Sequence, residues 1–374
     1  MIIAGETSGD ERGGELVREL RKRNPDIRLF GIGGDTLASL GVELVFHTRD
    51  TAIMGFAEVV AHLPFIFRMF RTCKRLLREK KPDAVILIDY PGFNLRFART
   101  VKKMGIPVIY YISPQVWAWG KHRVKKMADT IDLMLVLLPF EEEFYRKHGL
   151  RAKFVGHPVK DHINIKHSRD EFCSSYGLDP GKPILGLLPG SRAQEIKKLL
   201  PPMREAAHIC KKRIPGLQVI MAQSPSLAQT LFSSSRVTGR EIIPVTGKPH
   251  DVMAHADALL VASGTATLEA AIIKTPMVIC YRLSRLTYFI GKMVVSVDAI
   301  GLANIVAGEK IVPELIQEKA TPQNMAEYVV PLLTDTSKAE TMKEGLALVA
   351  RKLGQPGSAA HTAESILTFL ANRE

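Results

Sequence analysis

The sequence predicts an α/β protein made of two Rossmann-like domains, each with a parallel sheet covered by helices. Three observations support this fold class. Short aliphatic and β-branched runs alternate with amphipathic segments, as in a series of βαβ units. Most of these runs are apolar throughout, which is typical of parallel strands buried on both faces. The cycle also restarts near the middle of the 374 residues, a length that suggests two domains more readily than one.

The first half of the chain contains a series of apolar runs that we expect to form strands. They occupy residues 2–5, 29–34, 42–46, 84–89, 107–113 and 133–139. Amphipathic segments between them predict helices at residues 13–23, 64–80, 93–104 and 140–148. "FVGHPVKDHI" (154–163) follows, and we interpret the polar stretch after it as a linker. The predicted N-terminal domain therefore covers residues 1–163.

The second half repeats the architecture without repeating the sequence. A strand and turn at residues 183–192 lead into a helix near residues 194–213. Further strands are expected at residues 217–222, 240–245, 256–265 and 275–281, and the pattern is helical from about residue 322. The predicted second domain covers residues 164–345. Ligands of such sheets bind outside the carboxyl ends of the strands, so chemistry is expected there.

The composition limits the partners that the protein can have. A formal net charge of +13 indicates an anionic partner: nucleic acid, anionic lipid or a phosphorylated metabolite. Cys73, Cys173, Cys210 and Cys280 lack C-x-x-C spacing, so we expect neither disulfides nor a metal site. No signal peptide opens the chain, and no apolar run is long enough to span a bilayer. These features predict a location in the cytosol or on the cytosolic side of a membrane.

A strand–turn–helix motif at "LPGSRAQEI" (188–196) predicts an anion site. Gly190, Ser191 and Arg192 follow the strand, and the arginine opposes the dipole of the helix that it begins. Turn amides and a guanidinium together can bind one phosphate. The alternative is that Arg192 is a solvated first-turn residue capped by Ser191.

A second motif of the same kind occurs at "VASGTATLEAAI" (261–272). Ser263, Gly264 and Thr265 form the turn, and Glu269 lies where its carboxylate could accept hydrogen bonds from a ribose diol. Ordinary capping also explains these residues. Two such motifs in one domain, with an arginine, favour a diphosphate site.

The first half offers two further polar turns. "GETSGD" (5–10), with Glu6, Thr7 and Ser8, leaves the first strand but matches neither a dinucleotide fingerprint nor a P-loop. "IDYPGFN" (88–94) places Asp89 at the carboxyl end of a strand, with Asn94 in the same motif. Apolar surroundings would raise the pKa of Asp89 toward that of a general base. An Asx-turn before Pro-Gly is the alternative.

Two more candidates lie near strand ends of the first half. "SPQVWAWGKHR" (113–123) contains Trp117, which could stack on a sugar, cover an acyl chain or simply pack in the loop. His157 in "GHP" is expected to end the last strand of this half. A lone histidine is more often structural, so it is only a candidate.

"PFIFRMFRTCKRLLREKK" (64–81) predicts an amphipathic helix. Its apolar stripe is expected to cover the sheet and comprises Ile66, Met69, Phe70, Cys73, Leu76 and Leu77. The helix cannot span a bilayer, because each arginine at mid-membrane would cost about 2.5–3.5 kcal/mol. On an anionic surface each basic residue would instead contribute roughly 1 kcal/mol. The candidates for membrane contact are Val59, Val60, Leu63, Phe65, Phe67, Arg68 and Arg71.

The motifs taken together resemble those of the lipid-A-disaccharide synthase family. They are, in order, "AGETSGD", "IDYPGFN", "SPQVWAW", "LPFE", "FVGHP", "LPGSR--EI" and "ASGTATLE". The resemblance runs from residue 3 to beyond "NIVAGEKIVPELIQE" (304–318). Each motif is modest, but their joint order is highly specific.

The resemblance implies a GT-B fold with two facing domains, the acceptor on the first and the donor nucleotide on the second. It implies that a final helix, 346–374, packs back toward the first domain. The implied reaction joins UDP-2,3-diacylglucosamine to 2,3-diacylglucosamine 1-phosphate, with inversion, giving a β-1′,6-linked disaccharide and UDP. The UDP-sugar is then a substrate, and neither a cofactor nor a metal is expected. The implied location is the cytosolic face of the inner membrane, on anionic phospholipid, and a homodimer is one assembly to consider.

The resemblance also implies roles for individual residues. Asp89 becomes the favoured general base, and Arg192 with the helix N-termini meets the charge on the departing UDP. Asn304, in a segment that resembles the family's "LPN--AG", is expected to help hold the nucleotide, although Ala303 replaces the usual proline. The residues expected on the acceptor side are Glu6, Thr7, Ser8, Asn94, Trp117 and His157.

Two other readings compete with this one. A UDP-N-acetylglucosamine 2-epimerase, or another GT-B transferase, would share the nucleotide site but use a soluble, unacylated donor. A basic nucleic-acid-binding module would explain the charge. The sequence has no recognisable nucleic-acid module, however, and its basic residues lie beside apolar stripes, so no nucleic-acid partner is expected.

Overall fold

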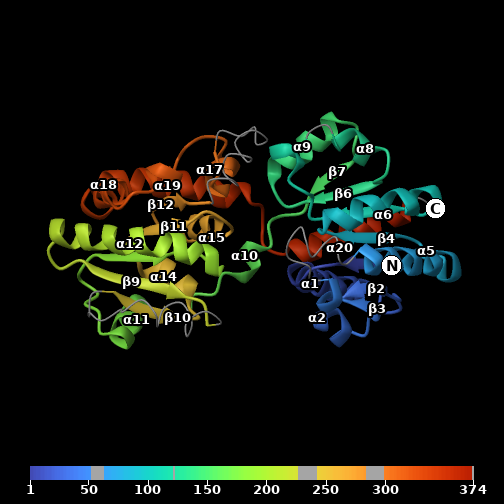
Figure 1. Ribbon diagram of the computed structural model, residues 1–374, viewed down its shortest axis with the longest axis horizontal. Helices are drawn as coiled ribbons and strands as arrows, with labels where there is room; N and C mark the ends of the chain where they lie inside the picture. Colours follow the sequence, from blue (N-terminus) through green and yellow to red (C-terminus); the bar gives the residue numbers. More distant parts are fainter. Residues whose placement is uncertain (52–62, 121–122, 226–241, 284–298, 373–374) are drawn as a thin grey trace. The chain divides into compact units, whose positions relative to one another are not determined.

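The computed structural model describes the chain except residues 52–62, 121–122, 226–241, 284–298 and 373–374. It consists of two compact units, each built around one parallel sheet (Figure 1). Unit 1 is Met1–Pro158 with Gly354–Glu374, and unit 2 is Val159–Leu353. The chain thus passes between the units after Pro158 and after Leu353, whereas the sequence suggested boundaries after residues 163 and 345.

Unit 1 contains a seven-stranded sheet of order β3-β2-β1-β4-β5-β6-β7. Its strands are β1 (Ile2–Ala4), β2 (Phe30–Gly33), β3 (Glu43–His47), β4 (Val85–Ile88), β5 (Val108–Tyr111), β6 (Leu133–Val136) and β7 (Ala152–Phe154). Its described helices are α1 (Thr7–Arg23), α2 (Asp35–Ser39), α3 (Thr48–Thr51), α5 (Leu63–Lys80), α6 (Pro91–Lys103), α7 (Val116–Trp119), α8 (Val124–Ala128), α9 (Pro139–Lys147) and α20 (Ser358–Ala371).

Unit 2 contains a six-stranded sheet of order β10-β9-β8-β11-β12-β13. Its strands are β8 (Ile184–Leu188), β9 (Gln218–Gln223), β10 (Ile243–Thr246), β11 (Ala258–Ala262), β12 (Met277–Tyr281) and β13 (Glu314–Ile316). Its described helices are α10 (Val159–His162), α11 (Arg169–Tyr176), α12 (Ala193–Arg213), α14 (Pro249–His255), α15 (Ala266–Ile273), α17 (Leu302–Ala307), the 3₁₀ turn η2 (Gln317–Lys319), α18 (Pro322–Thr334) and α19 (Thr336–Lys352).

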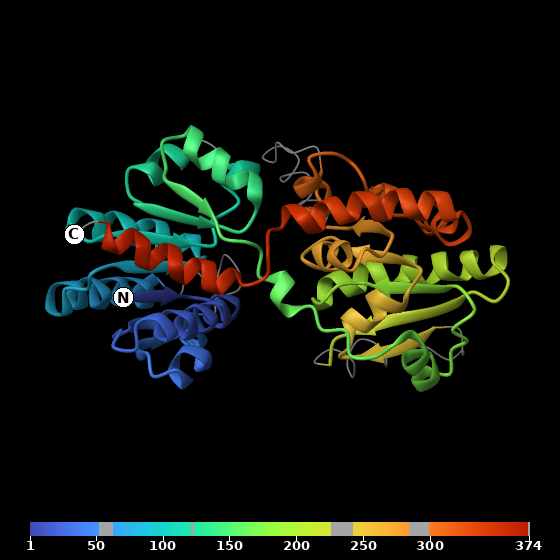
Figure 2. The same cartoon turned by 180° about the vertical axis from the view of Figure 1, so that it is seen from behind.

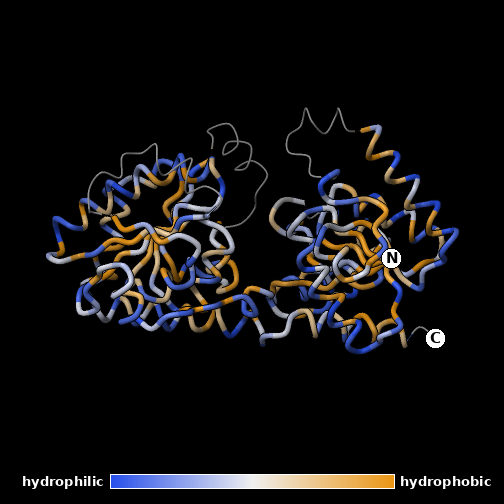
Figure 3. Tube along the Cα trace, turned by 90° about the horizontal axis from the view of Figure 1, so that it is seen from below, coloured by the Kyte–Doolittle hydropathy of each residue, from blue (hydrophilic) through white to orange (hydrophobic). Residues whose placement is uncertain are grey.

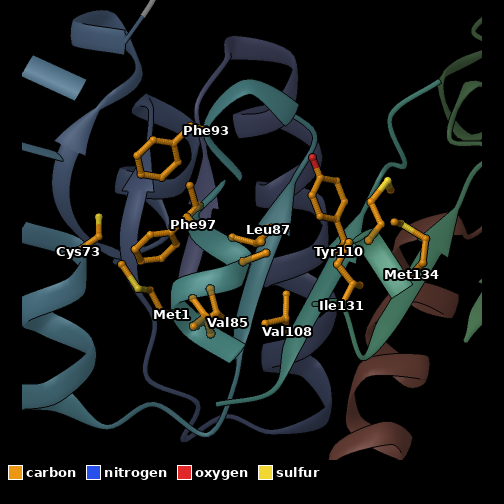
Figure 4. Packing of buried hydrophobic residues seen from close by; sticks show 14 of the residues in the cluster. Met1, Cys73, Val85, Leu87, Phe93, Phe97, Val108, Tyr110, Ile131 and Met134 are labelled. Carbon is orange, nitrogen blue, oxygen red and sulfur yellow. The ribbon is translucent and has the colours of Figure 1, made fainter. Parts of the chain in front are cut away.

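The core of unit 1 consists of two apolar layers, one on each face of its sheet. Successive side chains of a strand point to opposite faces, so Tyr110 joins the layer of Met69, Cys73 and Phe97, which Figure 4 shows in part. Its neighbour Tyr111 joins the other layer. The central strands are therefore buried on both sides. In Figure 3 the hydrophobic colour is concentrated in the interior of each unit. The four cysteines are free and buried.

Helix α20 belongs to unit 1 although it ends the chain. It packs beside α1, and its Ala363, Ile366 and Phe369 complete the second apolar layer (Figure 2). Ser358 at its first position donates a hydrogen bond to the carbonyl of Gly156, at 2.9 Å. The predicted C-terminal segment is thus two helices in different units, because α19 ends at Lys352 in unit 2.

Several sequence expectations were wrong in detail. Helix α1 begins at Thr7, not residue 13, so most of "GETSGD" is helical. The expected linker after residue 163 contains α11, which starts with a capping box of Ser168 and Glu171. The last strand of unit 1 ends at Phe154, three residues before His157. Edge strand β13 was not expected, because three residues give little pattern.

We predict that Phe369→Ala lowers the free energy of unfolding of unit 1 by about 3–5 kcal/mol, as for large core truncations. Phe369 is only 5% exposed, so the change leaves a cavity against the sheet. Denaturant unfolding followed by circular dichroism measures the change. Thr368→Ala, on the exposed side of the same helix, is the control and should change the value by less than about 0.5 kcal/mol. Equal effects of the two variants would contradict the assigned packing.

Candidate active site

An open cavity of about 510 Å³ lies in unit 2 at the carboxyl ends of β8, β9 and β11. It is formed where the strand order reverses, between β8 and β11. This is the place where open α/β sheets bind ligands. The cavity brings together all but one of the residues that the sequence assigned to the nucleotide: Gly190, Ser191, Arg192, Ser263, Gly264, Thr265 and Glu269.

The turn before α12 holds its shape through Gly190. This residue has a φ of +112°, and a Cβ there would approach Glu195 Oε2 to 2.6 Å, so only glycine fits. Arg192 is the N-cap of α12, and its side chain is 83% exposed, 3.7 Å from the Glu195 carboxylate. An exposed ion pair at that distance is weak. The guanidinium and the first-turn amides of α12 are therefore available to an anion.

The turn before α15 presents a second helix N-terminus to the same cavity. Gly264 has a φ of +153°, and open space surrounds the position of a Cβ. Thr265 is the N-cap but makes no side-chain capping bond, and Thr267 Oγ1 donates to the Gly264 carbonyl at 2.8 Å. Ordinary capping by Thr265, one of the alternatives, is thus not what the structure shows.

His250 is a residue of this site that sequence reasoning missed. It follows Pro249 at the start of α14, and its Nε2 lies 3.8 Å from Glu269 Oε2. The backbone N–H of Asn164 donates to His250 Nδ1 at 3.2 Å, so the proton of the neutral ring is on Nε2, facing Glu269. The imidazole is therefore a neighbour of the carboxylate, at a distance too long for a hydrogen bond. A histidine in an ordinary helix start carries no signal of this in the sequence.

Asn304 does not line the cavity. It is 1% exposed, its Nδ2 donates to Glu314 Oε1 and to the Val312 carbonyl, both at 2.8 Å, and its Oδ1 accepts from Val312 N. Glu314 in turn accepts from the amides of Ile300 and Gly301, just before α17. Asn304 therefore stabilises the segment before α17 through Glu314. The Ser263 hydroxyl donates a hydrogen bond to the Ile300 carbonyl of that segment, at 3.4 Å.

A larger cavity of about 600 Å³ lies at the opposite end of the same strands, where β8, β11 and β12 begin. Three of its cations are paired with acids: Arg169 with Asp257, Lys182 with Asp179 and Lys343 with Glu340. Since this end lies away from the carboxyl ends of the strands, the smaller cavity is the better candidate.

Asp89 lies at the corresponding place in unit 1, directly after β4, where the strand order reverses between β1 and β4. Asp89 and Tyr90 have φ angles of 45° and 46°. Such left-handed residues cost about 1–3 kcal/mol each and cluster at functional sites. The Asp89 carbonyl accepts from Tyr110 OH at 2.6 Å and from Asn94 Nδ2 at 2.8 Å. Asn94 is fully buried, so it positions Asp89 from within and does not face a ligand.

Burial raises the pKa of Asp89 to about 6, and the nearby Glu6 carboxylate contributes to the same shift. Glu6 is exposed at the N-cap of α1, and Thr7 and Ser8 are exposed in the first turn. The ring of Tyr90 lies against Gly5, where a Cβ would come within 2.2 Å of Cδ1. The two turns after β1 and β4 are thus in direct contact.

Trp117 is buried, and the structure does not offer it for stacking. Its Nε1 donates to Glu141 Oε1 at 2.9 Å, and Phe140 packs edge-on against its ring. The packed-loop alternative is therefore correct for this residue. His157 is partly buried, and burial together with the Arg12 guanidinium lowers its pKa to about 4, so the imidazole is neutral at pH 7. No group of His, Cys, Asp or Glu in the described part of the chain could hold a metal ion.

The membrane candidates separate into distinct environments. Leu63 and Phe67 of α5 are 42% and 66% exposed, beside the exposed Arg68 and Arg71. Phe65 instead packs edge-on against Phe46 of β3, at 5.6 Å, under the Arg68 guanidinium. The expected sheet-covering stripe is buried at Met69, Cys73, Leu76 and Leu77. Val59 and Val60 lie outside the described residues. Among the described residues, no helix is long and apolar enough to cross a bilayer.

Solved structures with a similar fold define the class of protein. A putative UDP-N-acetylglucosamine 2-epimerase from Listeria monocytogenes superposes with a TM-score of 0.62 at 12% identity, over 100% of this chain and 95% of the other. MurG of Acinetobacter baumannii gives a TM-score of 0.59 at 13% identity, over 98% of each chain. At such identities the likeness shows the fold alone. The chain has the GT-B fold, shared by nucleotide-sugar epimerases and glycosyltransferases.

The sequence comparisons then specify the family. The model of the family described as "Lipid-A-disaccharide synthetase" matches residues 1–366. The lipid-A-disaccharide synthase of Geobacter metallireducens is 44% identical over 100% of this chain and 97% of its own. The synthase of Myxococcus xanthus is 42% identical over 99% and 97%. The chain belongs to the lipid-A-disaccharide synthetase family, and it is a glycosyltransferase of lipid A biosynthesis.

We predict that Glu6→Gln lowers the pKa of Asp89, because one of the two causes of its elevation is a like charge that the variant removes. Carboxyl carbon NMR titration measures the shift. Glu11→Gln, an exposed substitution on the same helix, is the control and should leave the pKa of Asp89 in place.

The raised pKa also has a consequence for stability. Between pH 3.8 and about 6 the folded protein holds the Asp89 proton more tightly than the unfolded chain does. The contribution of Asp89 to the free energy of unfolding therefore falls as pH rises through this window. Replacement of Asp89 by Asn should make the free energy of unfolding depend less on pH in that range. An unchanged slope of this free energy against pH would argue against the raised pKa of Asp89.

Proposed function

We propose that this chain transfers the sugar of UDP-2,3-diacylglucosamine to the 6-hydroxyl of 2,3-diacylglucosamine 1-phosphate. The products are the β-1′,6-linked disaccharide 1-phosphate and UDP. The observation that carries this proposal is the pair of sites at the two strand-order reversals: a partly buried carboxyl, Asp89, in unit 1, and an anion-binding cavity in unit 2. Family membership over the full chain supports the choice of acylated substrates.

The donor part of the proposal rests on the cavity in unit 2. Two helix N-termini and the exposed Arg192 offer positive potential to a diphosphate. Glu269, with His250 beside it, offers an acceptor for the two ribose hydroxyls. A solved structure of S. aureus MnaA with UDP shares the fold, with a TM-score of 0.62 at 12% identity. These features favour a uridine diphosphate in this cavity.

The acceptor part rests on Asp89. A base works best when its pKa lies near the working pH, and about 6 satisfies this better than an ordinary aspartate. In the proposed step, Asp89 removes the proton of the acceptor hydroxyl as that oxygen forms a bond to the anomeric carbon. The bond from that carbon to the UDP oxygen breaks, and the electron pair leaves with UDP. Attack opposite the leaving group inverts the anomeric centre.

The charge that develops on UDP must be met by fixed positive groups. We assign this role to Arg192 and to the first turns of α12 and α15, which need no reorganisation during the reaction. The UDP-sugar acts as a substrate, so the proposal includes no cofactor.

A binding site for the membrane surface accompanies this function. Both substrates carry acyl chains, and α5 exposes Leu63 and Phe67 next to Arg68 and Arg71. A helix with this pattern binds at the surface of anionic lipid without crossing it. We propose that α5 holds the protein at the cytosolic face of the inner membrane.

The experiment that tests the function is a UDP-release assay with the purified chain and the diacylated donor. UDP should appear only when 2,3-diacylglucosamine 1-phosphate is present, together with a new lipid disaccharide in mass spectrometry. Unacylated UDP-N-acetylglucosamine is the control for the epimerase alternative. Conversion of that sugar without the lipid acceptor would favour the epimerase and refute the proposal.

We predict that a change at Asp89 in unit 1 affects turnover, whereas a change at Arg192 in unit 2 affects UDP binding. Asp89→Asn should lower kcat by about 10²–10⁴-fold, as loss of a general base does, and leave UDP affinity unchanged. Arg192→Ala should weaken UDP binding about tenfold or more, since a charged hydrogen bond is lost. Calorimetric titration with UDP and the release assay measure both. Lys197→Ala, an exposed cation further along α12, is the control for nonspecific charge. Normal turnover of Asp89→Asn would remove Asp89 as the base.

We predict that the double variant Leu63→Ser with Phe67→Ser binds vesicles at least tenfold more weakly. Each buried side chain of this size contributes about 1.5–3 kcal/mol when it leaves water. Cosedimentation with vesicles of phosphatidylcholine and phosphatidylglycerol measures binding. The matched control changes Ile165 and Tyr328 to Ser, since these unit 2 residues are 45% and 48% exposed. Equal binding of both double variants would exclude α5 as the membrane contact.

A further inference from the structure

The loop after β5 contains a strained residue close to the proposed base. Ile112 has a φ of 67°, a conformation that a β-branched residue almost never adopts without support from its surroundings. It stands between Tyr111, whose carbonyl accepts from Asp89 N at 3.0 Å, and Ser113. Tyr111, at the end of β5, thus binds the backbone of Asp89, and the strained turn begins at the next residue.

Glu141 is the group that holds the far side of this turn. Its Oε1 accepts from Ser113 Oγ at 2.7 Å and from Trp117 Nε1 at 2.9 Å, and its Oε2 accepts from Leu138 N at 3.0 Å. The residue is only 3% exposed. Burial raises the pKa of Glu141 to about 7, and the hydrogen bonds from Ser113, Leu138 and Trp117 oppose that rise. They come from the loops after β5 and β6, so Glu141 ties two strand ends together.

A second contact from the same helix acts on the same loop. Tyr145, one turn after Glu141 on α9, donates from its hydroxyl to the Pro114 carbonyl at 3.0 Å. Tyr110 reaches Asp89 from β5: in Figure 4 its ring lies among the apolar side chains and its hydroxyl points away from them. Ser113 and Pro114, which α9 contacts, therefore follow directly in the chain after Tyr110 and Tyr111, which contact Asp89.

We infer that Glu141 is a positioning residue for the transfer reaction: by anchoring Ser113 and Trp117 it maintains the strained Ile112 turn and thereby the position of Asp89. It does not touch the substrates. This inference rests on the proposed function of Asp89 and extends it to a residue outside the two ligand sites. The buried Trp117 then has a purpose: its indole N–H is one of the donors that make the buried carboxylate tolerable.

The test compares variants of Glu141 with a control on the same helix. Glu141→Ala should lower kcat at least tenfold, with UDP affinity unchanged, because the nucleotide cavity is in unit 2. Glu141→Gln should lose less, since it keeps an acceptor for Ser113 and Trp117 while its NH₂ group opposes the N–H of Leu138. Glu143→Ala, which removes only an exposed ion pair with Lys147, should retain full activity.

The acidic limb of the pH profile separates positioning from a merely structural role. Glu141→Gln and Glu141→Ala both remove the carboxyl of Glu141, whose pKa of about 7 lies close to that of Asp89, so these two variants are compared with each other. If the loop moves, water reaches Asp89, and the limb that reports Asp89 lies at lower pH in Glu141→Ala than in Glu141→Gln. A lower melting temperature with unchanged kcat and an unchanged limb would overturn the inference. Where Glu141→Ala does not fold, Ser113→Ala removes one donor and should give a smaller loss of kcat in the same direction; normal turnover there would count equally against it. An inactive wild-type chain would instead refute the proposed function itself.

Discussion

Both sheets are entirely parallel, and in each the strand order reverses once, between β1 and β4 and between β8 and β11. At such a reversal the two crossover connections leave toward opposite directions, which makes the turns after the paired strands the usual place for a ligand. Glu6 and Asp89 follow one such pair, and the turns at Gly190 and Gly264 follow the other. The positions of both candidate sites are consequences of this single topological constraint.

Carboxylates inside the protein accept hydrogen bonds from backbone amides at some of the helix starts. Asp10 accepts from the amides of Gly34, Thr36 and Leu37 and so occupies the start of α2. Glu314 accepts from the amides of Ile300 and Gly301, directly before α17. The starts of α12 and α15 have no such internal acceptor among the described side chains, and both face one cavity. Free amides at a helix start are suited to an external anion, which is the role that the proposed function gives to the two starts at this cavity.

The sequence was sufficient for the elements that are defined by local pattern. Buried parallel strands read as continuous apolar runs, and the pattern of a strand, a glycine turn and a helix identifies the two turns that line the cavity of unit 2. Trp117 was expected on the acceptor side and Asn304 at the nucleotide, but both side chains are buried. The position of a residue in a motif does not show which way its side chain points. Their partners, Glu141 and Glu314, come from other elements, and only the fold brings them together. His250 was missed for the same reason.

The electrostatics of Asp89 are local and oppose the charge of the whole chain. A net charge of +13 would by itself favour the ionised carboxylate and lower its pKa. Charges beyond about 8 Å are largely screened at physiological ionic strength, however, so distant lysines and arginines contribute little. Burial and the Glu6 carboxylate act at short range and determine the direction of the shift. Glu6 is exposed and Asp89 is partly buried, and burial brings the pKa of Asp89 to about 6, closer to neutral pH than that of an ordinary aspartate. A strongly basic surface, which suits anionic lipid, is therefore compatible with a proton acceptor in the site that it surrounds.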